Sequence, residues 1–288
     1  MKSKKLLPWG SRTFIMGIIN VTPDSFSGDG LLDEENVKNA AVEKASFFIK
    51  QGVDILDVGG ESTRPGADYV SEDEEINRVV PIIQKIRESY PHILISVDTY
   101  KANVASEAIR AGADWINDVW GFRGDPEMGT AAAEYQVPVV LMHNRLKAGS
   151  PQVEERLGGR YIGTDYDDLI SDICDELMKS VSLAHQSGVN DEKIILDPGI
   201  GFGKTVTQNL ELLDRLDEIK ALGYPLLIGP SRKSFIGYTL DLPPEERLEG
   251  TAAAVVLAID RGADIIRVHD VGYMTRVARM TDAIVRRN

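Results

Sequence analysis

Short runs of consecutive apolar residues recur along the chain and alternate with segments in which apolar residues return every three or four positions. Continuous apolar runs are typical of parallel strands that are buried on both faces. The spacing between them predicts helices. The expected strands lie at 13–19, 52–58, 92–97, 112–119, 137–142, 193–197, 224–229 and 262–270.

Glycines and capping residues mark the ends of several expected helices. Gly52, Gly112 and Gly262 each follow a helical segment, and glycine accepts the left-handed conformation that ends a helix. Asp125 is expected to cap the helix that follows it. The clearest helical patterns cover 33–51, 71–86, 125–135 and 209–223.

Eight alternations of strand and helix in a chain of 288 residues predict an α/β protein with a (β/α)8 barrel fold. The alternative is an open, doubly wound sheet. Because no linker or low-complexity segment interrupts the pattern, we expect a single domain over residues 1–288. The longest irregular stretch, 144–165, is expected to be a loop.

Polar residues end most of the expected strands, where a barrel carries its catalytic groups. Asp98, Asn117 and Asp197 offer oxygen acceptors, which suit a heterocycle edge that is rich in N–H donors. Lys233 can donate to a ring nitrogen or oxygen. The remaining polar ends include Asn20, Asp57, Asp118, His143, Arg267, His269 and Asp270, and Arg64 lies in the segment after the second strand.

The segment LDPGIGFGKT (196–205) has some features of a phosphate-binding P-loop. Pro198, however, stands where that motif needs its first glycine, and proline has no N–H to give to a phosphate. We therefore expect Asp197 to contact a ligand and Lys204 to be a loop or solvent-facing residue that contributes little to activity.

Composition limits the classes of partner. The net charge is −13, which argues against nucleic acid or an anionic membrane as the main partner. The single cysteine, Cys174, lies at helical spacing among apolar residues, which favours a buried role. No apolar run is long enough for a signal peptide or a membrane span. These features predict a soluble, cytoplasmic protein.

Eight motifs, in order, are similar to those of the dihydropteroate synthases, pterin-binding barrel enzymes of folate biosynthesis. The motifs cover nearly the whole chain: MGIINVTPDSFS (16–27), DILDVGGESTRPGA (54–67), SVDTYK (96–101), INDV (116–119), LMH (141–143), LDPGIGFGK (196–204), GPSRKSFIG (229–237) and IIRVHDV (265–271). The resemblance implies condensation of 6-hydroxymethyl-7,8-dihydropterin pyrophosphate with p-aminobenzoate, assisted by Mg2+, in an enzyme that is commonly a homodimer.

The resemblance also implies roles for individual residues. Asn20 would ligate Mg2+ and join the residues that bind the pyrophosphate. The residues implied in the pterin site are Asp98, Asn117, Met142, Asp197, Phe202, Gly229, Lys233 and Arg267; those around p-aminobenzoate are Phe26, Arg64, Pro65, Lys233 and Ser234; those at the pyrophosphate are Asn20, Arg64, Arg267 and His269; and those with catalytic roles are Asp29, Arg64, Lys233, Arg267 and His269.

The implied chemistry is loss of pyrophosphate before the amine attacks, with a loop carboxylate stabilising the pterin cation. The family usually has DSFSDGG where this chain has DSFSGDG, so its loop acid moves from position 28 to Asp29, with Asp24 as the other candidate. Alternatives are a pterin-dependent methyltransferase, a sugar-phosphate aldolase or isomerase barrel, and a non-enzymatic interaction protein.

Overall fold

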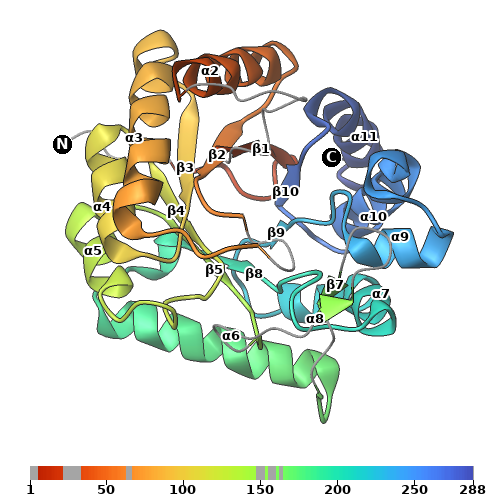
Figure 1. The fold of residues 1–288 in the computed structure, drawn as a ribbon. Coiled ribbons are helices and arrows are strands. Elements are labelled where there is room, and N and C mark those ends of the chain that lie inside the picture. Colours follow the sequence, from red (N-terminus) through yellow and green to blue (C-terminus); the bar gives the residue numbers. More distant parts are fainter. Residues whose placement is uncertain are drawn as a thin grey trace.

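The computed structural model describes residues 6–21, 34–62, 67–146, 153–154, 160–161 and 165–287. In these residues eight parallel strands surround a common axis (Figure 1). The strands are β1 (Phe14–Asn20), β2 (Ile55–Gly59), β3 (Leu94–Asp98), β4 (Trp115–Asp118), β5 (Val139–Met142), β8 (Ile194–Asp197), β9 (Leu227–Ile228) and β10 (Ile265–Val268).

The sheet closes on itself, so the predicted barrel is confirmed and the open sheet is wrong. Its strand order is β8-β5-β4-β3-β2-β1-β10-β9. A parallel bridge between Leu196 and Leu226 joins the two ends of this order. A separate antiparallel pair, β6 (Val153–Glu154) and β7 (Arg160–Tyr161), lies within the stretch that was expected to be irregular.

Helices cover the outside of the barrel (Figure 1). Within the described ranges, no helix combines the length and the apolar composition that crossing a bilayer requires. The helices are α2 (Glu34–Lys50), α3 (Glu72–Ser89), α4 (Ala102–Ala111), α5 (Met128–Tyr135), α6 (Leu169–Gln186), α7 (Val206–Asp214), α8 (Leu216–Lys220), α9 (Ser234–Leu240), α10 (Leu248–Asp260) and α11 (Val271–Val285), with short 3-10 turns at Asp191–Lys193 and Pro244–Glu246.

Two helices differ from the prediction. Helix α5 begins at Met128 rather than beside Asp125. The Asp125 carboxylate instead accepts hydrogen bonds from the backbone N–H groups of Ala102 (2.8 Å) and Glu127 (2.9 Å), so it links α5 to the start of α4. The helix expected over 209–223 is divided at Arg215 into α7 and α8.

The core has two parts on opposite faces of the barrel wall. The larger part packs the strands against the surrounding helices. The smaller part contains one or two residues from most strands: Phe14, Met16, Ile55, Trp115, Val140, Ile195, Leu227 and Ile265. Leu7 and Trp9 pack against this smaller cluster from the N-terminal segment. Residues two positions further along the same strands have the same orientation, because side chains alternate along a strand. The residues at these positions, two beyond the apolar interior residues, form the candidate site.

Candidate functional site

A cluster of charged and amide side chains lies one layer beyond the apolar barrel interior. Arg267 connects its members: its Nε donates to Asp57 (2.6 Å) and a terminal guanidinium nitrogen donates to Asp98 (2.5 Å). The Asn117 amide donates to the same Asp57 oxygen (3.0 Å). Strands β2, β3, β4 and β10 therefore bring together three of the predicted site residues around a carboxylate, Asp57, to which the sequence had given no role.

Burial controls the charges in this cluster. Loss of water around the carboxyl of Asp98 raises its pKa to about 7, although Arg267 acts in the opposite direction. Burial likewise raises the pKa of Asp197. Burial opposes the charge of Arg267 too, yet the carboxylates of Asp57 and Asp98 raise its pKa. Buried ionisable side chains with shifted pKa values are typical of ligand-binding and catalytic sites.

Lys233 links the cluster to the loop after β8. Its Nζ donates to the carbonyl oxygen of Ile200 and lies 4.5 Å from the centre of the Phe202 ring. Burial lowers the pKa of Lys233 to about 8, while the nearby charge of Asp197 acts to raise it. The predicted proximity of Asp197, Phe202 and Lys233 is thus present in the structure.

Other predicted residues lie at the same end of the barrel. Met142 is buried at the end of β5 and pairs in register with Asp197. Gly229 follows β9 and lies against Arg267, because a Cβ there would come within 3.8 Å of the Arg267 Cβ. Ser234 begins α9. Asn20 is half-buried at the end of β1.

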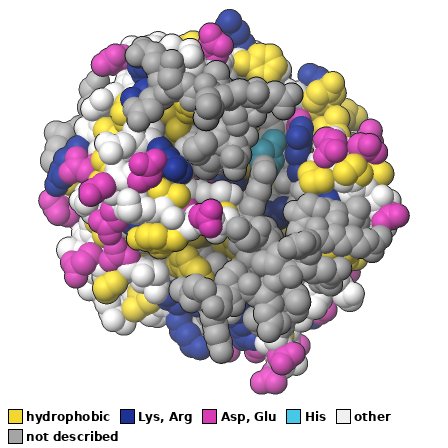
Figure 2. Space-filling view, in the orientation of Figure 1, with side chains coloured by type: hydrophobic (Ala, Val, Ile, Leu, Met, Phe, Trp, Pro, Cys, Tyr) yellow, Lys and Arg dark blue, Asp and Glu magenta, His cyan; other side chains and the backbone are white. Residues whose placement is uncertain are grey.

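His269 lies at the end of β10, where its Nδ1 is 3.0 Å from the Ser231 hydroxyl. On the face of the molecule that Figure 2 shows, a histidine lies near the centre with basic side chains beside it.

Four predicted residues, Phe26, Asp29, Arg64 and Pro65, lie outside the described residues, as does Asp24.

The segment between β9 and α9 is held by residues that sequence reasoning did not assign. Arg232 has a φ of 58°, which is uncommon for a residue other than glycine. Its guanidinium donates to both oxygens of Asp270 at 2.9 and 2.6 Å. Together with the contact between Ser231 and His269, this ion pair fixes the segment that carries Lys233 against the end of β10.

Lys204 is not the solvent-facing residue that the sequence predicted. Its side chain is buried, with the residue 3% exposed. Its Nζ contacts the carbonyl oxygens of Gly199 and Phe202 and the Nδ1 of His143. Burial lowers the pKa of Lys204 to about 7. The expectation that Lys204 contributes little to activity therefore loses its physical basis.

Two of the polar residues at strand ends, Asp118 and His143, bind other parts of the protein. Both carboxylate oxygens of Asp118 accept hydrogen bonds from backbone N–H groups, those of Trp120 (2.8 Å) and Phe122 (2.7 Å). The Nε2 of His143 lies 3.0 Å from a carboxylate oxygen of Glu176 on α6. Asp118 and His143 therefore support the site from behind.

His143 gives the protein a specific sensitivity to acid. Burial, with the charge of Lys204, lowers the pKa of His143 from 6.5 to about 4. The unfolded chain therefore binds more protons than the folded protein between these values, so stability falls as the pH falls from about 6.5 to 4. We expect the protonation of His143 to lower the free energy of unfolding by up to about 3 kcal/mol over this pH range.

The measurement is urea unfolding of the wild type and of His143→Asn from pH 7.5 to 4. The loss of stability below pH 6.5 should be smaller in His143→Asn than in the wild type. His92→Asn, which changes an exposed histidine, serves as the control and should follow the wild type. Parallel curves for all three proteins would contradict a neutral, buried His143.

A family model described as "Pterin binding enzyme" matches residues 16–269. A dihydropteroate synthase from Clostridium beijerinckii is 53% identical over 279 residues, which are 96% of each chain. Another, from Bacillus subtilis, is 50% identical over 279 residues, covering 97% of this chain and 91% of the relative.

Solved structures of dihydropteroate synthases are also similar to this chain. A Clostridium difficile dihydropteroate synthase crystallised in the presence of pteroic acid superposes with a TM-score of 0.87 at 48% identity, over 98% of this chain and all of the other. A Xanthomonas albilineans dihydropteroate synthase in complex with 7,8-dihydropteroate has a TM-score of 0.82 at 36% identity, over 96% of this chain and 94% of the other.

Proposed function

The chain belongs to the pterin-binding enzymes and, among them, to the dihydropteroate synthases, transferases that form a carbon–nitrogen bond, and we propose that it joins 6-hydroxymethyl-7,8-dihydropterin pyrophosphate to p-aminobenzoate. The products are 7,8-dihydropteroate and pyrophosphate. The single observation that supports this choice best is the set of acceptors and cations around Arg267 at the barrel mouth.

The pterin ring suits this set because one edge of it carries several N–H donors beside a ring carbonyl. In the proposal, Asp98 and Asp197 accept from the ring, and Asn117 pairs with the amide-like edge. Lys233 donates to a ring nitrogen or oxygen. Met142 and Phe202 supply apolar surface for the faces of the ring.

Arg267 and His269 are proposed to contact the pyrophosphate, since a guanidinium and an imidazole are good donors to phosphate oxygens. Both lie on or just after β10. The p-aminobenzoate is proposed to lie near Lys233 and Ser234, where α9 begins. Phe26, Arg64 and Pro65 are proposed to complete that part of the site.

The reaction needs a leaving group to be stabilised more than it needs a base. The aromatic amine of p-aminobenzoate is neutral at physiological pH and can attack directly. We propose that the bond between the pterin methylene and the pyrophosphate oxygen breaks first, with its electron pair leaving on the oxygen, and that the cationic side chains stabilise this charge. The amine nitrogen then bonds to the methylene carbon and releases one proton to solvent. Asp29 is proposed to stabilise the pterin cation.

The side chain of Asn20, at the end of β1, fits a magnesium ion that is held largely by the substrate. Asn20 can offer one amide oxygen, and Mg2+ typically takes one or two protein oxygens together with phosphate oxygens and waters. Among the described residues, no three His, Cys, Asp or Glu side chains form a metal site. When bound, the ion would neutralise charge on the pyrophosphate.

Incubation with the pterin pyrophosphate, p-aminobenzoate and Mg2+ tests the proposed function. We expect dihydropteroate to form and a chelator to slow its formation. Transfer of a methyl group from methyltetrahydrofolate, with no dihydropteroate formed, would instead support the methyltransferase alternative.

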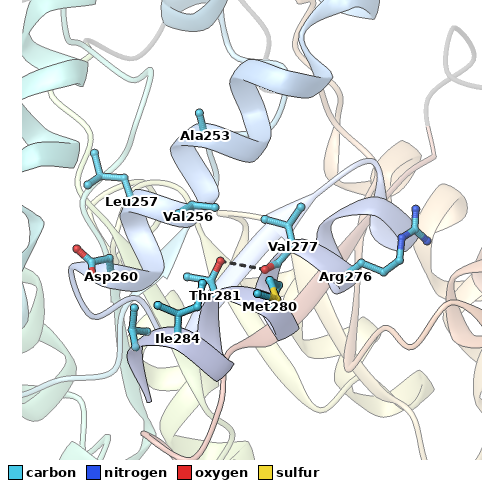
Figure 3. A pocket seen from close by; sticks show the side chains of 10 residues that line it. Ala253, Val256, Leu257, Asp260, Arg276, Val277, Met280, Thr281 and Ile284 are labelled. Carbon is cyan, nitrogen blue, oxygen red and sulfur yellow. Dashed lines mark hydrogen bonds between the residues drawn. The ribbon is translucent and has the colours of Figure 1, made fainter. Parts of the chain in front are cut away.

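A groove between α10 and α11 supports a second proposal, that two copies of the chain associate. Its volume is about 830 Å³, and its lining is mostly apolar (Figure 3). Met280 and Ile284 on α11 are 64% and 51% exposed, and Val256 on α10 is 43% exposed. Contiguous exposed apolar surface of this kind is typical of an interface.

The charges of the groove favour a second copy as the occupant. Asp260 and Arg276 lie on opposite sides of the apolar lining in Figure 3. In a two-fold interface, a residue on one subunit meets a different residue on the other, and the reverse contact also forms. Asp260 of each copy could then pair with Arg276 of the other, while the apolar residues pack between them.

We expect Met280→Glu to shift the protein from dimer to monomer, because it places a charge at the most exposed apolar position of the groove. Sedimentation velocity at several concentrations measures the shift. Met178→Glu, on α6 and away from the groove, is the control and should remain dimeric. A wild type that sediments as a monomer at every concentration would reject the dimer.

A further inference from the structure

Lys204 makes three polar contacts from a buried position beneath the segment 198–203. Its Nζ donates to the carbonyl oxygens of Gly199 and Phe202, both at 3.0 Å, and lies 3.1 Å from the Nδ1 of His143. In its protonated form Lys204 has three N–H donors, one for each of these contacts. The lysine therefore binds the protein's own loop.

The backbone of this loop has a conformation that its sequence allows but does not enforce. Gly199, Gly201 and Gly203 have φ values of 71°, 84° and 61°. A Cβ on Gly199 would lie 1.9 Å from the carbonyl oxygen of His143, so the loop rests directly on the end of β5. Because glycine reaches many other conformations when free, contacts with the surrounding side chains help to select this one, together with the backbone hydrogen bond from Phe202 to Gly199.

Besides Asp197, whose carboxylate accepts the Gly199 N–H at 2.8 Å, Lys204 and Asn209 supply contacts of this kind. Lys204 holds the carbonyls on either side of the central turn. Asn209, on α7, accepts the N–H of Gly201 at 2.6 Å through its Oδ1 and donates to the carbonyl of Thr205 at 2.8 Å. The loop is thus fixed at both carbonyl and N–H groups.

The anchor continues from Lys204 to helix α6. A protonated Lys204 can only donate, so in that state the Nδ1 of His143 accepts and its Nε2 donates to Glu176 at 3.0 Å. Glu176 also accepts from the Nε of Arg145 at 2.8 Å. This chain of contacts connects the loop to a long helix on the outside of the barrel.

The opposite side of the same loop contacts Lys233. That lysine donates to the carbonyl oxygen of Ile200, and its Nζ is 4.5 Å from the Phe202 ring centre. Ile200 and Phe202 both lie within the span that Lys204 holds at residues 199 and 202. The position of the Lys233 ammonium consequently depends on contacts made by Lys204.

We propose that Lys204 is a positioning residue that places Phe202 and Lys233 for a planar heterocycle bound at the barrel mouth. The proposal rests on the proposed function, because it names the pterin ring as that heterocycle. In this proposal, part of the affinity of the protein for the ring depends on the contacts that Lys204 makes with the loop.

Lys204→Met tests this proposal, since methionine removes the donors with a small change in volume. Calorimetric titration with 6-hydroxymethylpterin should give a Kd about 10- to 100-fold above that of the wild type, as expected when a hydrogen bond from a charged group is lost or misaligned. Lys179→Met, an exposed position on α6, is the matched control and should match the wild type.

Hydrogen exchange separates positioning from simple loss of stability and does not depend on catalysis. The Gly201 amide should exchange faster in folded Lys204→Met than in the control. An unchanged rate there, or an unchanged Kd accompanied only by a lower Tm, would overturn the proposal. If Lys204→Met does not fold, Lys204→Gln, which keeps an amide donor, should give a smaller rise in both quantities, and no rise would overturn it.

If the wild type fails to bind 6-hydroxymethylpterin, the proposed function fails instead. The exchange comparison would still decide whether Lys204 holds the loop.

Discussion

Arg267→Met should lower the free energy of unfolding by about 3–5 kcal/mol at pH 7.5, the usual cost of removing one partner from a buried ion pair. The guanidinium donates to both Asp57 and Asp98, and the Asp57 side chain is fully buried. Without Arg267, two carboxylates would remain close together in a site with little water. Methionine would fill part of the space but could not compensate their charge.

The pH dependence identifies the cause of this loss. The pKa of Asp98 is already raised to about 7 with Arg267 present, and removing the cation should raise it further. Protonation then relieves the repulsion, so Arg267→Met should regain part of its stability at pH 5.5. The double variant Arg267→Met/Asp57→Asn should also be more stable than Arg267→Met.

Urea unfolding at the two pH values measures these effects. Arg110→Met, which breaks an exposed pair with Glu107, is the control and should cost under about 1 kcal/mol. A loss as small as that of Arg110→Met, or a loss that does not depend on pH, would show that Arg267 does not neutralise buried carboxylates.

Asp197→Asn should weaken binding of 6-hydroxymethylpterin by about 100-fold or more. One oxygen of Asp197 accepts the Gly199 N–H at 2.8 Å, which the amide oxygen of asparagine can still do. The asparagine NH2 would then face the N–H donors of the ring. Loss of two hydrogen bonds to a charged group costs about 3 kcal/mol or more, which is about 100-fold or more in Kd.

Calorimetry with wild type, Asp197→Asn and Asp214→Asn measures this effect. Asp214 is exposed at the end of α7, so its variant should bind the ring as the wild type does. Equal Kd values for Asp197→Asn and the wild type would remove Asp197 from the ring site.

The barrel could be predicted because its signals are local. Each strand is a short apolar run, and helix-ending glycines such as Gly52, Gly112 and Gly262 adopt the positive φ expected of them. The site residues could be located because side chains alternate along a strand. Asp57 had the same signal as Asn117, since each lies two positions after an interior residue, Ile55 or Trp115. That spacing could have identified it.

Two of the errors came from contacts between distant parts of the chain. Lys204 lies in a glycine-rich segment that reads as exposed, yet it is buried against His143, 61 residues earlier. Asp125 has the local features of a helix cap, yet its carboxylate also binds the N–H of Ala102, 23 residues earlier. No local pattern in the sequence indicates either contact.

The most direct test of the proposed reaction is to measure both products in one assay. With dihydropterin pyrophosphate, p-aminobenzoate and Mg2+, the wild type should release pyrophosphate and 7,8-dihydropteroate in equal amounts, and Asp197→Asn should release little of either. Pyrophosphate released without dihydropteroate, or equal turnover by wild type and Asp197→Asn, would contradict the proposed reaction at this site.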